Sequence, residues 1–227
     1  MSCVRLSTAT RARAQPIPFE PIGPAGLLRA LPGVQRVPTA SLEMFIVKRF
    51  LAPGHCQQLI ERIDRQSRPS TIADDIGDPA FRTSETCDLD GADPVVAEVN
   101  DAISALLGIA QALGEPIQGQ RYAQGQEFKP HTDTFEPTGP DYYEHCAERG
   151  NRSWTAMVYL NQPDAGGATR FKAIGKTIQP ETGKLLTWNN LLSDGRPNPA
   201  TLHQGLKVRR GAKYILTKWF RERAPGQ

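Results

Sequence analysis

The sequence predicts a mainly β-domain with supporting helices in front of it, and two observations carry this prediction. Segments with apolar residues at helical spacing come first, at 53–66 and 93–113. From residue 115 onward the chain consists of short β-type runs that Gly, Pro, Asn and Asp separate. Several such runs at short spacing are typical of an antiparallel sandwich or barrel.

Composition and charge exclude several classes of protein. Of the 227 residues, 39% are hydrophobic and 22% are charged, which is ordinary for a soluble globular chain. The apolar runs are too short for a membrane span, and the N-terminus lacks the apolar core of a secretory signal. The net charge is +3, but the excess lies in the first 40 residues, so we expect no nucleic-acid partner. Four scattered cysteines without a C-x-x-C pair indicate reduced thiols and a cytoplasmic protein.

Prolines and arginines set the first 40 residues apart from the rest of the chain. We expect residues 1–40 to be a loosely ordered arm that lies on or beside the domain. Residues 41–227 then form a single domain, long enough to bury a sizeable core. Within it, the β-part is expected at about 115–222.

The segment before the β-part contains one strand and two helices by its patterns. Residues 42–51 read "LEMFIVKRFL" and precede "APG", which indicates a strand followed by a turn. A first helix is expected at 53–66. The second helix has a broad apolar face, with Asp93 as its N-cap, Pro94 in its first turn and Gly114 at its end.

Seven β-type runs follow the helices. They are expected at 117–123, 153–161, 168–173, 176–180, 184–189, 202–208 and 213–220. In the last run the residues alternate, which places Lys213, Ile215, Thr217 and Trp219 on one side. A lysine that shares a strand face with Ile and Trp is costly unless an anion pairs with it. The plainer alternative is a lysine at the start of a strand that reaches water.

His131 and Asp133, in "FKPHTDTF", stand two residues apart in a stretch with no helical pattern. On an extended chain such side chains point to the same side, so both can contact one cation. A third ligand has to come from elsewhere, and His203 and His145 are the candidates. Two histidines and a carboxylate leave coordination positions open, which suits a non-haem Fe(II) enzyme or a zinc hydrolase. A polar surface turn is the alternative without a metal.

Three stretches together resemble the catalytic domain of the prolyl 4-hydroxylase-like 2-oxoglutarate/Fe(II) dioxygenases. They are "RYAQGQEFKPHTD", "RSWTAMVYLNQPDAGGATRF" and "DGRPNPATLHQGLKVRRGAKYILTKWF", and "FRTSETCDL" resembles the segment that precedes that domain. The resemblance runs from about Phe45 to Phe220. It implies a double-stranded β-helix (jelly roll) with supporting N-terminal helices and a catalytic core at about 115–222.

The resemblance also implies a set of site residues. His131, Asp133 and His203 fall on the Fe(II) ligands, and Lys213 falls on the partner of the distal carboxylate of 2-oxoglutarate. Tyr122 and Thr155 match positions that hydrogen-bond the same carboxylate, and Arg82 and Trp219 match positions near the peptide substrate. The implied cofactors are Fe(II), 2-oxoglutarate and O2, with ascorbate as a candidate reductant. The implied reaction hydroxylates an unactivated C–H and releases succinate and CO2.

Two departures from the family pattern leave the substrate open. Ala168 stands where the family's "GGET" has an acid, and Phe128 stands where many members have Tyr. A prolyl residue in a peptide or protein is the leading substrate, and a free amino acid or other small metabolite is the alternative. A non-catalytic jelly-roll binding module is a third reading, which the intact ligand set disfavours. The polar loop at 133–150 is a candidate for a substrate lid, and the sequence leaves open whether it acts as one.

Overall fold

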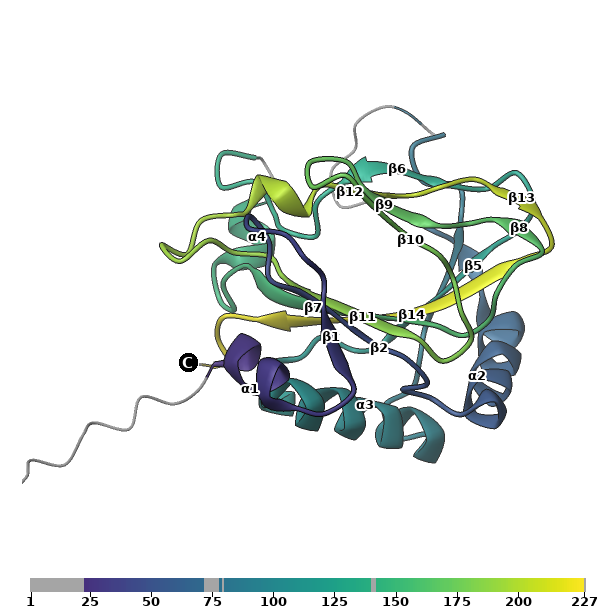
Figure 1. Ribbon diagram of the computed structural model, residues 1–227, viewed down its shortest axis with the longest axis horizontal. Coiled ribbons are helices and arrows are strands. Elements are labelled where there is room, and N and C mark those ends of the chain that lie inside the picture. Colours follow the sequence, from purple (N-terminus) through teal and green to yellow (C-terminus); the bar gives the residue numbers. More distant parts are fainter. Residues whose placement is uncertain (1–22, 72–77, 79, 140–141, 227) are drawn as a thin grey trace, which may run out of the picture.

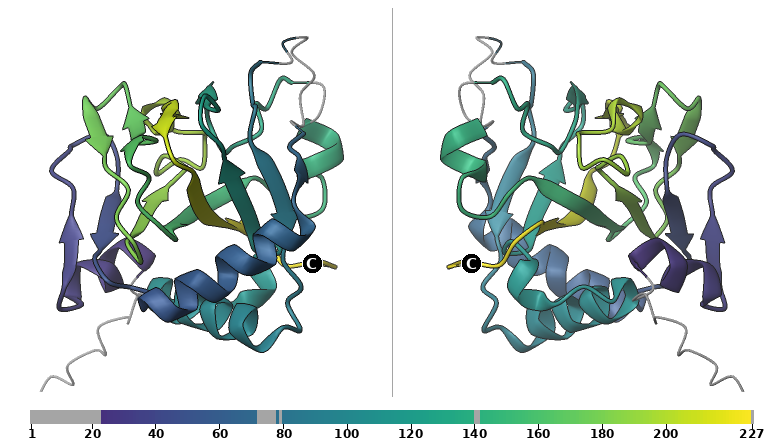
Figure 2. Two further views of the ribbon diagram at one scale, coloured as in Figure 1. Left: turned by 90° about the vertical axis from the view of Figure 1, so that its right-hand side faces the viewer. Right: turned by 90° about the vertical axis from the view of Figure 1, so that its left-hand side faces the viewer.

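The computed structural model describes residues 23–71, 78, 80–139 and 142–226 (Figure 1). Two antiparallel sheets lie opposite each other, and two long helices, α2 (Pro53–Gln66) and α3 (Pro94–Leu107), cover the outer face of the larger sheet (Figure 2). This is a jelly-roll core with supporting helices, so the predicted fold class is confirmed. None of the helices in the described part of the chain has the length and apolar character that a membrane crossing needs.

The larger sheet has eight strands in the order β1-β2-β11-β7-β14-β5-β4-β3. Its strands are β1 (Val34–Arg36), β2 (Met44–Val47), β3 (Arg68–Pro69), β4 (Glu85–Asp88), β5 (Gln118–Tyr122), β7 (Arg152–Tyr159), β11 (Leu185–Asn189) and β14 (Lys213–Arg221). The order mixes strands from the start, middle and end of the chain. The sheet therefore forms only when distant segments pair.

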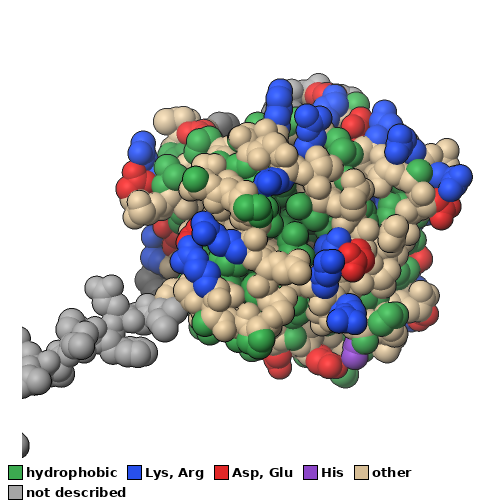
Figure 3. All heavy atoms as spheres, viewed as in Figure 1, with side chains coloured by type: hydrophobic (Ala, Val, Ile, Leu, Met, Phe, Trp, Pro, Cys, Tyr) green, Lys and Arg blue, Asp and Glu red, His purple; other side chains and the backbone are tan. Residues whose placement is uncertain are grey.

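The smaller sheet has four strands in the order β10-β9-β12-β6. Its strands are β6 (Phe128–His131), β9 (Thr169–Phe171), β10 (Lys176–Ile178) and β12 (His203–Gly205). A two-stranded ribbon, β8 (Ala165–Gly166) with β13 (Val208–Arg210), lies at one end. The short elements α4 (Tyr142–Cys146), η1 (Gln111–Leu113) and η2 (Pro199–Thr201) complete the described fold. On the face seen in Figure 3, Lys and Arg side chains are spread together with Asp and Glu.

Strand β14 divides the interior into two layers through its alternating side chains. Tyr214, Leu216 and Phe220 belong to the apolar core under α2 and α3. Lys213 and Trp219, from the opposite face, line a cavity between the two sheets. The alternation predicted for 213–220 is therefore confirmed, because the two faces meet different layers.

The second predicted helix begins where expected and ends earlier. The Asp93 carboxylate accepts hydrogen bonds from the backbone N–H groups of Val95 and Val96, as an N-cap does. The helix ends at Leu107 because Gly108 adopts a left-handed conformation with φ of 64°, which a residue without a Cβ does at low cost. The prediction that the helix continues to Gly114 was wrong.

The first 40 residues do not form a single separate arm. Helix α1 (Pro24–Ala30) buries Leu28 completely, and β1 pairs with β2 at the edge of the larger sheet. Apolar burial and strand pairing thus attach residues 24–36 to the domain, so the predicted boundary at residue 41 was wrong for this part. The predicted arm at 1–22 lies outside the described residues.

Gly119 on β5 marks a tight contact between the larger sheet and α2. A Cβ added there would lie 2.5 Å from Cγ1 of the fully buried Ile63. We expect Gly119→Ala to lower the free energy of unfolding by about 1–3 kcal/mol, because the packed core has no room for the methyl group. Urea unfolding measures this. Gly91→Ala is the matched control, since no atom lies within 4 Å of its Cβ position; an equal loss in both variants would contradict the account.

Candidate metal centre

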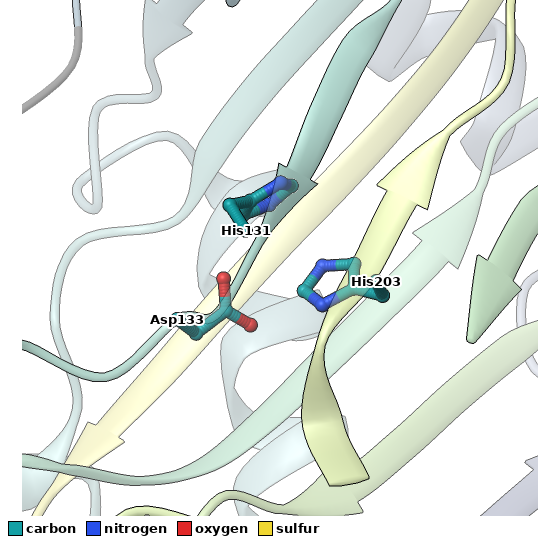
Figure 4. A group of neighbouring side chains, drawn as sticks. All are labelled: His131, Asp133 and His203. Atoms are coloured by element: carbon teal, nitrogen blue, oxygen red, sulfur yellow. The ribbon is translucent and has the colours of Figure 1, made fainter. Parts of the chain in front are cut away.

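Two short strands of the smaller sheet bring the predicted metal ligands together. His131 on β6 and His203 on β12 are direct cross-strand partners in the antiparallel register. Asp133 follows in the bend after β6. One ligand atom from each of the three side chains lies within 4.8 Å of the others, and Figure 4 shows the three pointing toward a common space. Among the described residues, no other group of three such side chains meets this criterion.

Backbone carbonyls fix both imidazole rings in the same way. Nδ1 of His131 lies 2.8 Å from the carbonyl oxygen of Lys129, and Nδ1 of His203 lies 2.9 Å from that of Thr201. A carbonyl only accepts, so each Nδ1 carries a hydrogen, and Nε2 is the ring atom left to bind a metal. Burial, and after it the charge of His203, lower the pKa of His131 to about 3. His131 is therefore neutral at physiological pH, which is the form that binds metal.

Asp133 is 7% exposed and is held by one side-chain hydrogen bond. The Thr155 hydroxyl donates to its Oδ2 at 2.7 Å. Burial acts to raise the pKa of Asp133, but the two histidines and the Thr155 hydrogen bond outweigh it, and the net shift is downward. The carboxylate is therefore ionised, as a ligand for a hard or borderline cation must be.

The structure places Thr155 differently from the prediction. Thr155 was expected to hydrogen-bond the 2-oxoglutarate carboxylate next to Lys213. In the register of the larger sheet, however, Thr155 is paired with Trp219, while Lys213 is paired with Tyr122. Six residues along β14 separate the two pairs, which corresponds to roughly 20 Å of strand. Thr155 contacts the carboxylate of Asp133, at the metal end of the site.

Lys213 lies at the other end of the cavity and is 1% exposed. Its Nζ lies 4.6 Å from the ring centroid of Tyr122 and 6.0 Å from that of Tyr159. No carboxylate pairs with it among the described residues, and burial alone lowers its pKa to about 7. A buried ammonium with aromatic neighbours and no counter-ion is a site for the negative end of a ligand.

Several residues around this cavity were missed by the sequence analysis. Gln120, Tyr159 and Thr169 are buried, and the Tyr159 hydroxyl donates to Thr169 at 2.7 Å. Gln120 accepts from the Tyr122 hydroxyl at 2.8 Å. The alternation of side chains along the predicted strands could have identified two of these residues. Position 159 follows 155 on one face of β7, and position 120 precedes 122 on one face of β5.

A second cavity of about 480 Å³ opens outside the metal cluster. Arg82 and Trp219 line both this outer cavity and the inner one, so they lie between the two. The Arg82 guanidinium bonds only neutral oxygens, and burial lowers its pKa. Phe135 and His145 stack at 4.6 Å in the wall, which places His145 outside the metal cluster.

One carboxylate organises the charged wall of the outer cavity. Glu115 accepts two hydrogen bonds of 2.8 Å from Arg152 and forms an ion pair of 2.7 Å with Arg221. Arg152 in turn lies over the Trp219 ring, with its central carbon 3.9 Å from the ring centroid. Burial acts to raise the pKa of Glu115, but Arg152 and Arg221 outweigh it and the net shift is downward. The orientation of Trp219 therefore depends on this ionic network.

Known proteins are similar to this chain in sequence and in fold. Residues 117–221 match the 2OG-Fe(II) oxygenase superfamily. The chain is 31% identical over 163 residues to prolyl 4-hydroxylase subunit alpha-1 from Homo sapiens, covering 71% of this chain and 30% of that relative. It is 28% identical over 182 residues to prolyl 4-hydroxylase subunit alpha-2 from Caenorhabditis elegans, covering 80% of this chain and 32% of the relative. The chain thus spans about a third of the length of these relatives.

Solved structures of prolyl hydroxylases share the fold of this chain. The 2-oxoglutarate complex of the viral collagen prolyl hydroxylase from Paramecium Bursaria Chlorella virus-1 superposes with a TM-score of 0.63 at 26% identity, covering 80% of this chain and 96% of that one. A prolyl-4-hydroxylase from Pseudomonas putida, at 20% identity and a TM-score of 0.58, shares the fold over 88% of this chain and 99% of that one.

In its fold, its cluster of possible metal ligands and its sequence over residues 117–221, the chain is similar to the 2-oxoglutarate/Fe(II) oxygenases. The matched relatives and the first of these structures are prolyl hydroxylases, so the chain resembles the prolyl 4-hydroxylase-like oxygenases, as its sequence predicted. Enzymes of this class use Fe(II), 2-oxoglutarate and O2.

The network around Glu115 generates a stability prediction. We expect Glu115→Gln to lower the free energy of unfolding by about 3 kcal/mol at neutral pH, because two guanidinium groups then lack their counter-charge. Since the pKa of Glu115 is lowered in the folded protein, its contribution is lost as the pH falls through that pKa. The difference between variant and wild type should therefore shrink on acidification.

Urea unfolding at several pH values measures this difference. The exposed pair Glu61 and Arg65 provides the control, and Glu61→Gln should change stability by less than about 0.5 kcal/mol. Equal small effects in both variants would contradict the role assigned to Glu115.

Proposed function

We propose that this chain is a 2-oxoglutarate- and Fe(II)-dependent dioxygenase that hydroxylates an unactivated C–H bond, with a prolyl residue in a peptide or protein as its substrate. One observation carries the proposal. Two imidazoles and one carboxylate converge at one end of a cavity whose other end holds a buried lysine, which no carboxylate of the described residues pairs with.

The donor set fits Fe(II). Two Nε2 lone pairs, from His131 and His203, and one carboxylate, from Asp133, supply three ligands on one side of an ion. An Fe(II) ion held by these three side chains would have positions left for a co-substrate and O2. The acidic and imidazole ligands alone also suit Zn²⁺, but a closed structural zinc site needs a fourth protein ligand. No such ligand joins the cluster among the described residues.

The residues that line the inner cavity suit 2-oxoglutarate in their chemistry. Its far carboxylate is proposed to pair with the ammonium of Lys213, in a charge-assisted contact that offsets the burial of both charges. Tyr122 is proposed to bind beside it, since its buried hydroxyl already takes part in the polar wall. Tyr159 also lies near Lys213, and its hydroxyl donates to Thr169, which lines the cavity.

Bound Fe(II) supplies the activation of O2, which couples decarboxylation of 2-oxoglutarate to succinate and CO2 with insertion of oxygen into the substrate C–H. The residues of the chain position the two substrates. Lys213 orients the co-substrate, and Arg82 and Trp219 are proposed to hold the substrate where the outer cavity meets the inner one. The predicted lid at 133–150 remains a proposal, as do ascorbate as a reductant and a cytoplasmic location.

The prolyl substrate is supported by the relatives and by the open outer cavity. The matched proteins are named prolyl 4-hydroxylases, and the volume of about 480 Å³ accommodates several residues of a peptide. Ala168 and Phe128 differ from the family pattern, so a free amino acid or small metabolite is the alternative substrate. Anaerobic reconstitution with Fe(II), followed by a screen of 2-oxoglutarate turnover with proline-containing peptides and with free amino acids, distinguishes the two. Turnover coupled only to free metabolites would remove the peptide substrate.

Removing a proposed metal ligand should abolish the reaction without unfolding the chain. We expect His131→Ala and Asp133→Ala to form less than roughly a thousandth of the wild-type succinate, because the remaining two ligands no longer hold the ion. Succinate release measures activity, and circular dichroism checks the fold. His55→Ala is the control, because His55 lies outside the cluster beside Glu98. Wild-type turnover in the ligand variants would refute the metal site.

The lowered pKa of Lys213 predicts how 2-oxoglutarate binding depends on pH. In the empty site the ammonium loses its proton as the pH rises through about 7, whereas a bound carboxylate keeps it protonated. Affinity should therefore fall above pH 7, by roughly fiftyfold between pH 7 and pH 9, with uptake of a proton on binding. Calorimetric titration of the Mn(II)-loaded protein in buffers of different ionisation enthalpy measures both quantities.

Lys213→Met serves as the control for this titration. It should bind 2-oxoglutarate more weakly at every pH and take up no proton, while Mn(II) binding stays close to wild type. A wild-type affinity that is constant from pH 7 to pH 9 would contradict the role of Lys213.

A further inference from the structure

We infer that Thr155 and Asn190 are positioning residues for the metal, acting through Asp133. The inference rests on the proposed metal site and adds residues that do not touch the ion themselves. Asn190 Nδ2 lies 2.8 Å from Thr155 Oγ1, and Thr155 Oγ1 lies 2.7 Å from Asp133 Oδ2. We call this chain of two hydrogen bonds the relay.

The chemistry of the three groups fixes the direction of the relay. An ionised carboxylate only accepts, so the single hydroxyl hydrogen of Thr155 must go to Asp133. The Thr155 oxygen then has only lone pairs left, and the neighbouring amide must donate to it. Asn190 supplies that donor, which is the reason why an amide side chain suits this position and a carboxylate does not. Each hydrogen bond in the relay thus has one allowed direction.

The relay fixes the orientation of the metal-binding carboxylate. Thr155 occupies Oδ2 of Asp133, and no other side-chain or backbone donor reaches this carboxylate in the described part of the chain. The bond therefore holds the plane of the carboxylate and leaves the other oxygen for the ion. It also acts before any metal binds, because Thr155 stands on the central strand β7 and is fully buried.

The main chain of Asn190 extends the network to the second histidine ligand. The Asn190 carbonyl accepts from the Asn198 N–H at 2.8 Å, and the Asn198 carbonyl accepts from the Thr201 hydroxyl at 2.7 Å. The Thr201 carbonyl then accepts from Nδ1 of His203 at 2.9 Å. Hydrogen bonds thus connect Asn190 to Asp133 through its side chain and to His203 through its main chain. These two ligands come from different segments of the chain.

Stability of the fold alone does not account for Asn190. The side chain is fully buried, and its Oδ1 finds no hydrogen-bond partner among the described residues. An unsatisfied buried amide oxygen costs stability, and an apolar side chain would avoid that cost. The amide is useful for the one bond that it does make, which is the bond to Thr155.

Co(II) affinity of the purified protein tests the relay without any need for turnover. Thr155→Val keeps the shape of the side chain and removes the hydroxyl, and we expect Co(II) to bind on the order of 10–100-fold more weakly, with a changed visible spectrum. Thr155→Ser restores a hydroxyl and should bind Co(II) within about threefold of wild type. Thr187→Val is the matched control, because that hydroxyl is equally buried but donates to the Thr155 carbonyl. It should lower the melting temperature and leave Co(II) binding unchanged.

Asn190→Ala supplies a second, independent measurement, and it decides alone if Thr155→Val does not fold. We expect roughly a threefold to tenfold loss of Co(II) affinity, and no further loss when Asn190→Ala is added to Thr155→Val, since Asn190 acts through Thr155. Wild-type Co(II) affinity in both single variants would overturn the relay. Absence of Co(II) binding by the wild-type protein would instead overturn the metal site on which the inference rests.

Discussion

The register between two short strands is the constraint on which the site depends. β6 and β12 contribute few residues, yet their antiparallel pairing places His131 directly opposite His203, with their ring centroids 4.3 Å apart. A shift by one residue would turn one imidazole to the other face of the sheet. On its other side His203 is paired with Phe171 of β9, so both neighbours of β12 hold the same register. The metal site therefore exists only when segments from the middle and the end of the chain are paired correctly.

The larger sheet contributes Lys213 to the site, and the burial of this charged side chain costs free energy. Strand β14 buries the Lys213 ammonium on one face and contributes Tyr214, Leu216 and Phe220 to the apolar core on the other. Burial of the unpaired Lys213 lowers its pKa to about 7, so the fold maintains a cation in a place that disfavours charge. Stabilisation comes when an anion arrives, which links the stability of this strand to the presence of the co-substrate. A structural role alone would be served better by a hydrophobic side chain at position 213.

Local patterns in the sequence predicted a mainly β-domain, most of its strands and two of the three cluster residues, and the family resemblance supplied the jelly roll and the third ligand. Period-two alternation placed Lys213 and Trp219 on one face of β14, and spacing placed His131 beside Asp133. The family resemblance selected His203 over His145, a choice that spacing left open. The end of α3 was misplaced because two glycines, Gly108 and Gly114, were available, and only the backbone conformation distinguishes them.

The role of Thr155 could not be predicted for a different reason. Its contact with Asp133 joins β7 to the bend after β6, and that contact depends on how the two sheets face each other rather than on any local pattern. The same holds for Asn190, which lies outside every predicted motif and becomes significant only through the neighbours that folding gives it. Residues that support ligands are thus harder to find in a sequence than the ligands themselves.

Anomalous diffraction from crystals soaked with Mn(II) and 2-oxoglutarate tests the central claim most directly. The account predicts a single strong metal peak bonded to Nε2 of His131, Nε2 of His203 and one oxygen of Asp133. It also predicts the far carboxylate of 2-oxoglutarate on the Nζ atom of Lys213. A metal peak that is away from these three side chains, or a co-substrate whose far carboxylate points away from Lys213, would contradict it.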